Sequence, residues 1–63
     1  MDSRIKVIVN GRIDWSRSNL TRMEALRLAV RAMGVISYGK WYKIGVNTRR
    51  CLTPTEERTV VVY

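Results

Sequence analysis

The chain has 63 residues, and its twelve Lys and Arg against five Asp and Glu give a net charge of +7 and an isoelectric point near 10.6. A hydrophobic fraction of 46% and a charged fraction of 27% are typical of a folded protein, and the length allows one small basic domain, residues 1–63. The absence of His and the presence of one cysteine, Cys51, exclude a histidine general base, an internal disulfide and a Cys/His zinc site.

The first expected element is a strand over residues 4–10, where apolar and basic side chains alternate. Asn10-Gly11 follows and predicts a type I′ turn, because both residues tolerate positive φ. A short return strand over residues 12–15 then places Ile13 opposite Ile8. The polar residues 16–21 are suited to starting a helix.

A helix is expected between Thr21 and Gly34. Thr21 and Glu24 have the spacing of a capping box, with Asn19 as the competing N-cap, and Gly34 is suited to end the helix. A wide apolar stripe runs along it, formed by Met23, Leu26, Ala29, Val30 and Met33 and widened by Ala25, Leu28 and Ala32. A stripe of this width predicts that the helix lies flat on the face of a sheet.

Short segments fill the rest of the chain. They are expected to be an extension over 35–38 with a turn at 39–40, a strand over 41–47, a basic loop over 48–52, a short helical turn over 53–56 and a strand over 59–63. The sequence therefore predicts an α+β fold. One amphipathic helix packs on a small, three- to four-stranded, mostly antiparallel sheet in the order β(β)αββ.

The strand over residues 41–47 is the best functional candidate. We expect Tyr42, Ile44 and Val46 to point toward the helix, which turns Trp41 and Lys43 toward solvent. An aromatic ring beside cations is suited to single-stranded nucleic acid, because bases stack on the ring and phosphates contact the cations. The predicted contact residues are Trp41, Lys43, Arg49, Arg50, Lys6 and Arg12. In the alternative interpretation, Trp41 only closes the second face of a thin sheet.

These patterns favour a non-enzymatic module that binds DNA or RNA, with no cofactor and no metal. Nine of the twelve basic residues are Arg, whose planar guanidinium group contacts phosphates through two hydrogen bonds. The longest apolar run covers only residues 60–63, and the N-terminus lacks the layout of a signal peptide, so we expect a cytoplasmic protein without a membrane span. A DNA-reading helix fits less well, since only three polar side chains are left free on the helix.

The alternative function is protein binding, as an inhibitor or adaptor that docks on an acidic surface of a larger host enzyme. In size and layout the chain resembles small accessory proteins of phages and mobile elements, although no motif identifies a family. The strand over residues 59–63 has no charged residue after Arg58. If that strand lies at the edge of the sheet, it invites strand addition by a partner or by a second copy in a homodimer.

Overall fold

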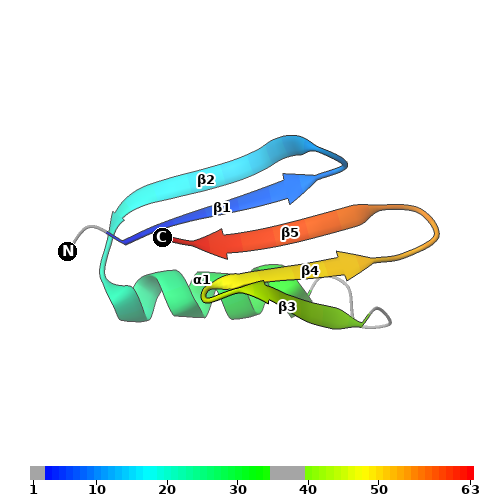
Figure 1. Cartoon of the computed structure of the whole chain (residues 1–63). Helices are drawn as coiled ribbons and strands as arrows, with labels where there is room; N and C mark the ends of the chain where they lie inside the picture. Colours follow the sequence, from blue (N-terminus) through cyan, green and yellow to red (C-terminus); the bar gives the residue numbers. More distant parts are fainter. Residues whose placement is uncertain (1–2, 35–39) are drawn as a thin grey trace.

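A five-stranded antiparallel sheet carries a single helix on one of its faces in the computed structural model, which describes residues 3–34 and 40–63 (Figure 1). The elements are β1 (Ser3–Val9), β2 (Arg12–Leu20), α1 (Arg22–Gly34), β3 (Trp41–Gly45), β4 (Thr48–Leu52) and β5 (Glu57–Val62). The strand order across the sheet is β2-β1-β5-β4-β3. The predicted α+β class with one helix on an antiparallel sheet is confirmed, but the sheet has five strands instead of three or four.

The hairpin of β1 and β2 follows the turn chemistry of the sequence. Asn10 and Gly11 have φ values of 51° and 84°, and Ile8 lies opposite Ile13 as predicted. Strand β2 is longer than the expected return arm, because residues 16–20 continue the pairing with β1 instead of leading into the helix. Most of its side chains are polar and exposed, which suits a strand at the edge of the sheet.

Helix α1 begins with the predicted capping box. The Thr21 backbone N–H donates to Glu24 Oε1 at 2.9 Å, and the Glu24 backbone N–H donates to Thr21 Oγ1 at 3.1 Å. The two bonds satisfy donors that the first turn of a helix otherwise leaves without partners. The helix ends at Gly34, as expected; the extension predicted for residues 35–38 and Gly39 of the following turn lie outside the described residues.

The core lies between α1 and the centre of the sheet. Its buried side chains come from three elements and are Ile5, Val7, Ala25, Ala32, Val60 and Val62. The helix therefore contacts the sheet most closely through two alanines. Part of the predicted stripe, namely Met23, Leu26 and Val30, stays exposed, so the apolar arc is wider than the face that the sheet covers.

Strand β5 lies at the centre of the sheet, hydrogen-bonded to β1 on one side and to β4 on the other. The predicted strand at the C-terminal end of the sequence is confirmed, but it does not lie at an edge of the sheet, the condition under which we expect strand addition. Both of its hydrogen-bonding edges are occupied, so β5 has no free edge for strand addition or for a homodimer formed that way.

The segments between β3 and β5 differ from the sequence-based expectations. Residues 48–52, expected as a loop, form strand β4, whose Cys51 is buried. Thr53 Oγ1 accepts hydrogen bonds from the Glu56 and Thr55 backbone N–H groups at 3.0 and 3.3 Å, as an N-cap does. The chain then enters β5 instead of a helix, because Thr53 and Glu56 also pair through their backbones across the turn. No helix among the described residues is long and apolar enough to cross a bilayer.

Candidate nucleic-acid interface

The sheet has one face against α1 and one face that no described helix covers, which we call the open face. Residues paired across antiparallel strands point to the same side, so the register assigns each side chain to a face. Ile5 and Val7 are buried under α1, and the alternate residues of β1 therefore lie on the open face. The open face comprises Arg4, Lys6, Ile8, Ile13, Ser16, Tyr42, Thr48, Arg50, Leu52, Glu57, Thr59, Val61 and Tyr63.

One row of side chains crosses the open face through all five strands. From β2 to β3 the paired residues are Ile13, Ile8, Thr59, Arg50 and Tyr42. Arg50 Nε donates to Thr59 Oγ1 at 3.3 Å, which directs the guanidinium group across the sheet. Thr59 is only 6% exposed although it lies on the face opposite α1, and Arg50 is in contact with its hydroxyl oxygen. Tyr42 ends the row with 52% of its surface exposed, beside a positioned cation.

A second aromatic ring lies at the other end of the open face. Tyr63 and Arg4 exchange backbone hydrogen bonds of 2.7 and 2.9 Å, which fix the last residue of the chain beside β1. Lys6 Nζ lies 5.2 Å from the centroid of the Tyr63 ring, within the range of a cation–π contact. The open face thus holds two tyrosines, each with basic side chains next to it.

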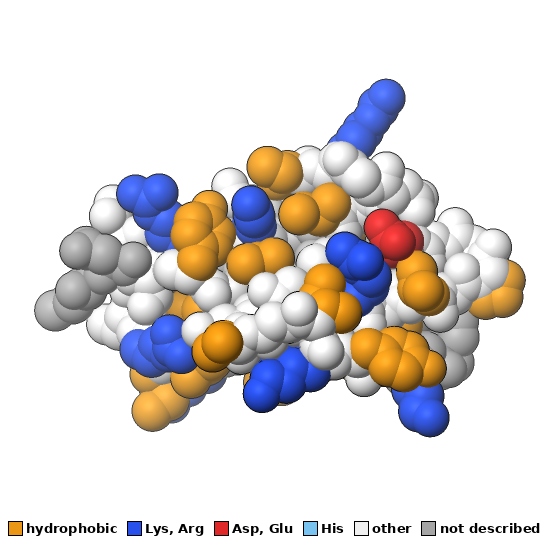
Figure 2. Space-filling model, viewed as in Figure 1, with side chains coloured by type: hydrophobic (Ala, Val, Ile, Leu, Met, Phe, Trp, Pro, Cys, Tyr) orange, Lys and Arg blue, Asp and Glu red, His pale blue; other side chains and the backbone are white. Residues whose placement is uncertain are grey.

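Basic and hydrophobic side chains are interspersed on the face of the molecule that Figure 2 shows. In the view in which β3 and β4 pass in front of α1, Lys and Arg side chains are interspersed with hydrophobic ones, and acidic side chains show in one small area only (Figure 2). Glu57, paired with Leu52, is the acidic residue that the β4–β5 register assigns to the open face. The mixture is suited to a ligand that has flat apolar groups and negative charges.

The structure divides the six predicted contact residues between two faces. Lys6 and Arg50 lie on the open face. Trp41 and Lys43 pair with Cys51 and Arg49, which lie on the helix side of the sheet. Arg12, at the start of the edge strand β2, pairs with Val9 and also lies on the helix side. The predicted cluster around Trp41 therefore does not form on one surface together with Arg50.

The assumed orientation of β3 is wrong. Tyr42, Ile44 and Val46 are exposed, with Val46 at 82%, whereas Trp41 is half-buried and packs against the core. The indole ring has the largest apolar surface in this strand, so burying it beside Cys51 removes more area from water than burying Ile44 does. The Trp41 Nε1 atom is buried without a hydrogen-bond partner among residues 3–34 and 40–63.

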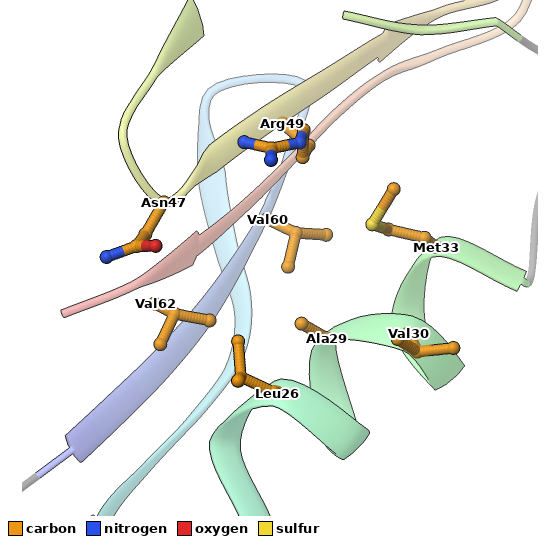
Figure 3. A pocket seen from close by; sticks show the side chains of 8 residues that line it. All are labelled: Leu26, Ala29, Val30, Met33, Asn47, Arg49, Val60 and Val62. Atoms are coloured by element: carbon orange, nitrogen blue, oxygen red, sulfur yellow. The ribbon is translucent and has the colours of Figure 1, made fainter. Parts of the chain in front are cut away.

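Arg49 lies in a groove on the helix side, beside α1 (Figure 3). The groove has a volume of about 200 Å³ and is lined by Leu26, Ala29, Val30, Met33, Asn47, Arg49, Val60 and Val62. Arg49 Nη1 donates to the Thr48 carbonyl oxygen at 3.2 Å, so the guanidinium group is held by backbone and not by a carboxylate. This groove is mainly apolar, unlike the open face.

Two aromatic residues of the open face, Tyr42 and Tyr63, are missing from the predicted contact set. The alternation in β3 predicts that Tyr42 and Trp41 point to opposite sides of the sheet. Exchanging the inward and outward sides places Tyr42 toward solvent. The contact between Tyr63 and Lys6 depends on the pairing of the last strand with the first, for which the sequence has no local signal.

Similarity to known proteins adds nothing to this geometry. No protein-family model matches the chain, and neither a curated protein nor a solved structure matches it significantly. Within the described residues, no three His, Cys, Asp or Glu side chains come together in a group that could hold a metal ion. The chemistry of the two sheet faces is therefore the remaining indication of function.

Proposed function

We propose that the open face binds single-stranded nucleic acid, without catalysis. The observation that carries the proposal is that two half-exposed tyrosines lie on an uncovered sheet face, Tyr42 beside Arg50 and Tyr63 beside Lys6. Bases stack on exposed aromatic rings of a sheet, and phosphate oxygens accept hydrogen bonds from neighbouring Lys and Arg side chains. The net charge of +7 adds attraction for a polyanion over a longer range.

The separation of the two tyrosines favours an oligonucleotide over a single base. Tyr42 is two strands away from β5, about 10 Å at the usual strand spacing. Thr59 is the residue of β5 in the same row as Tyr42. Tyr63 comes four residues after Thr59, so the two tyrosines are also separated by about 13 Å along the strand direction. A ligand that stacks on both rings must therefore span several nucleotides.

Fluorescence anisotropy with labelled single-stranded DNA and RNA tests the proposal. We expect the affinity to fall steeply between low and moderate salt, because phosphate contacts release bound counterions. Arg50→Gln should weaken binding and reduce the salt dependence by about one phosphate contact. Arg27→Gln on the exposed side of α1 is the matched control, since it removes the same charge away from the open face. Affinity that is independent of salt, or equal losses in both variants, would refute the proposal.

Docking on an acidic protein surface is the second candidate, and the groove beside α1 favours it. Val30 at its rim is 70% exposed, and Arg49 in its wall has no carboxylate partner among the described residues. An apolar segment with acidic side chains would fit both features. Purification from lysate with and without nuclease separates the two candidates, because a protein partner is retained after nuclease treatment and a partner bridged by nucleic acid is lost.

A further inference from the structure

A basic hollow lies between α1 and β2, on the side of the sheet opposite to the open face. Its volume is about 450 Å³, and its lining residues are Trp15, Arg17, Leu28, Arg31, Ala32 and Arg58. Trp15 pairs with Val7 and Arg17 pairs with Ile5, so both side chains share the face of the buried core. The hollow is therefore separate from the tyrosines of the open face, and its size is within the range of small-molecule sites.

Three arginines line this hollow, and one of them, Arg58, is paired with a carboxylate. Arg58 Nε donates to Glu56 Oε2 at 2.8 Å, and the Arg58 side chain is only 12% exposed, so this cation is held in place. Arg17 and Arg31 make no ion pair and no side-chain hydrogen bond with the described residues. Three like charges around one cavity are suited to an anion with several oxygen atoms, because each planar guanidinium group can donate two parallel hydrogen bonds.

The rest of the lining is flat and apolar. The indole of Trp15 is half-buried, and Leu28 and Ala32 of α1 contribute the other apolar surface. An inorganic anion has no apolar group to pack on such a surface, whereas a nucleobase stacks on an aromatic ring. Trp15 and the three arginines together match a ligand that combines a flat ring with a phosphate.

We propose that the hollow between α1 and β2 binds a nucleotide, with its phosphate on Arg17, Arg31 and Arg58 and its base against Trp15. The ligand is either a free mononucleotide or the phosphorylated end of a strand, since both have the same chemistry. The site does not depend on binding at the open face. If the proposed function is correct, the hollow gives the protein a second contact that recognises the end of a strand.

An NMR titration of the whole protein with AMP, adenosine and inorganic phosphate tests the site. The chain has two tryptophans, and their indole N–H signals report on different places, because Trp15 lines the hollow and Trp41 does not. We expect AMP to shift the Trp15 signal and leave the Trp41 signal in place, with tighter binding than either fragment. Equal affinity for AMP and phosphate would overturn the nucleotide assignment, as would displacement of AMP by an acidic peptide at equal concentration.

Charge-matched variants show whether the arginines of the hollow are responsible. Arg31→Gln should lower the affinity for AMP about tenfold, the usual effect of losing a charge-assisted contact. Arg27→Gln on the same helix, whose side chain is not part of the hollow, should leave the affinity within about twofold. Trp15→Phe keeps an apolar ring against the core and should reduce the preference for AMP over phosphate. Equal losses in the Arg27 and Arg31 variants would overturn the proposal.

Oligonucleotides with and without a 5′ phosphate distinguish the two sources of the ligand. In the Tyr42→Ala variant, which weakens the open face, a preference for the 5′-phosphorylated strand identifies the strand end as the ligand. Tight AMP binding without that preference identifies a free nucleotide. If AMP does not bind and Tyr42→Ala still loses oligonucleotide binding, nucleotide binding in the hollow is refuted, while binding of single strands at the open face remains supported.

Discussion

The corrected orientation of β3 predicts opposite roles for two adjacent aromatic residues. Trp41 packs against the core, so Trp41→Ala should destabilise the fold. Tyr42 is half-exposed on the open face, so Tyr42→Ala should spare the fold and weaken binding to single-stranded nucleic acid. An outward Trp41 would give the reverse pair of results.

The size of each effect follows from burial. Replacing a fully buried Trp by Ala costs about 3–5 kcal/mol, and the half-buried Trp41 should cost about 2 kcal/mol. That is a large share of the roughly 3–9 kcal/mol expected for a chain of this length. The free energy of unfolding of Trp41→Phe should stay within about 1 kcal/mol of that of the parent. Phe keeps an apolar ring at this position and removes a buried N–H that has no partner among the described residues. For Tyr42→Ala we expect a stability change of about 0.5 kcal/mol and a loss of affinity of about five- to 150-fold.

Urea unfolding and anisotropy titration of the same three variants measure both quantities. Unfolding of Trp41→Ala at the urea concentration of the parent protein would contradict the packing of Trp41 against the core. Binding by Tyr42→Ala as tight as that of the parent would contradict a contact between Tyr42 and the ligand. A Trp41→Phe variant as unstable as Trp41→Ala would show that the indole N–H has a stabilising partner.

Four further predictions concern individual residues. Thr59→Val keeps the β-branched shape but removes the oxygen that positions Arg50, so the affinity for single-stranded nucleic acid should fall about three- to tenfold. In a double-mutant cycle, Thr59→Val should cause no further loss of affinity in an Arg50→Gln background. Gly11→Ala should lower the free energy of unfolding by about 1–2 kcal/mol in thermal or urea unfolding, because Gly11 has φ of 84°. Thr21→Ala should cost about 1 kcal/mol by the same measurement, since it removes the hydroxyl of the capping box. The pKa of Glu24 is lowered by hydrogen bonds from the Thr21 backbone and side chain, so its contribution to stability is present above the usual Glu pKa and is lost as the pH falls through the lowered value.

Matched variants test whether the losses of stability in Gly11→Ala and Thr21→Ala are specific to the turn and to the capping box. Gly34→Ala should be neutral or slightly stabilising, because a Cβ at Gly34 meets no atom within 4 Å among residues 3–34 and 40–63 outside its own helical turn, and its φ is not positive. Thr21→Ser retains the capping hydroxyl and should recover most of the stability that Thr21→Ala loses. A Glu24→Gln protein that shows the acid unfolding profile of the parent would contradict a stabilising role of the Glu24 carboxylate.

Local chemistry predicted the parts of the fold that depend on near neighbours. The Asn10-Gly11 turn and the Thr21–Glu24 capping box each involve residues at most three apart, and both have the predicted geometry. The pairing partners of distant strands have no such signal. The position of β5 between β1 and β4 depends on contacts between the two ends of the chain, which a local pattern does not specify.

The candidate site was only partly predictable for the same reason. Period-two alternation in β3 leaves two possible phases, and counting apolar residues favoured the one with Tyr42, Ile44 and Val46 inside. The observed phase depends on the partner strand, where Cys51 is buried beside Trp41. Lys6 and Arg50 were identified from their charge, but their common face emerges only when β1, β5 and β4 are paired.

Mapping a single-stranded oligonucleotide onto the protein by NMR tests the central claim most directly. We predict that the largest shifts fall on the open face, at Tyr42, Arg50, Lys6 and Tyr63, and that they shrink as salt is raised. Shifts confined to the groove beside α1, around Val30 and Arg49, or an absence of shifts at low salt, would contradict binding at the open face.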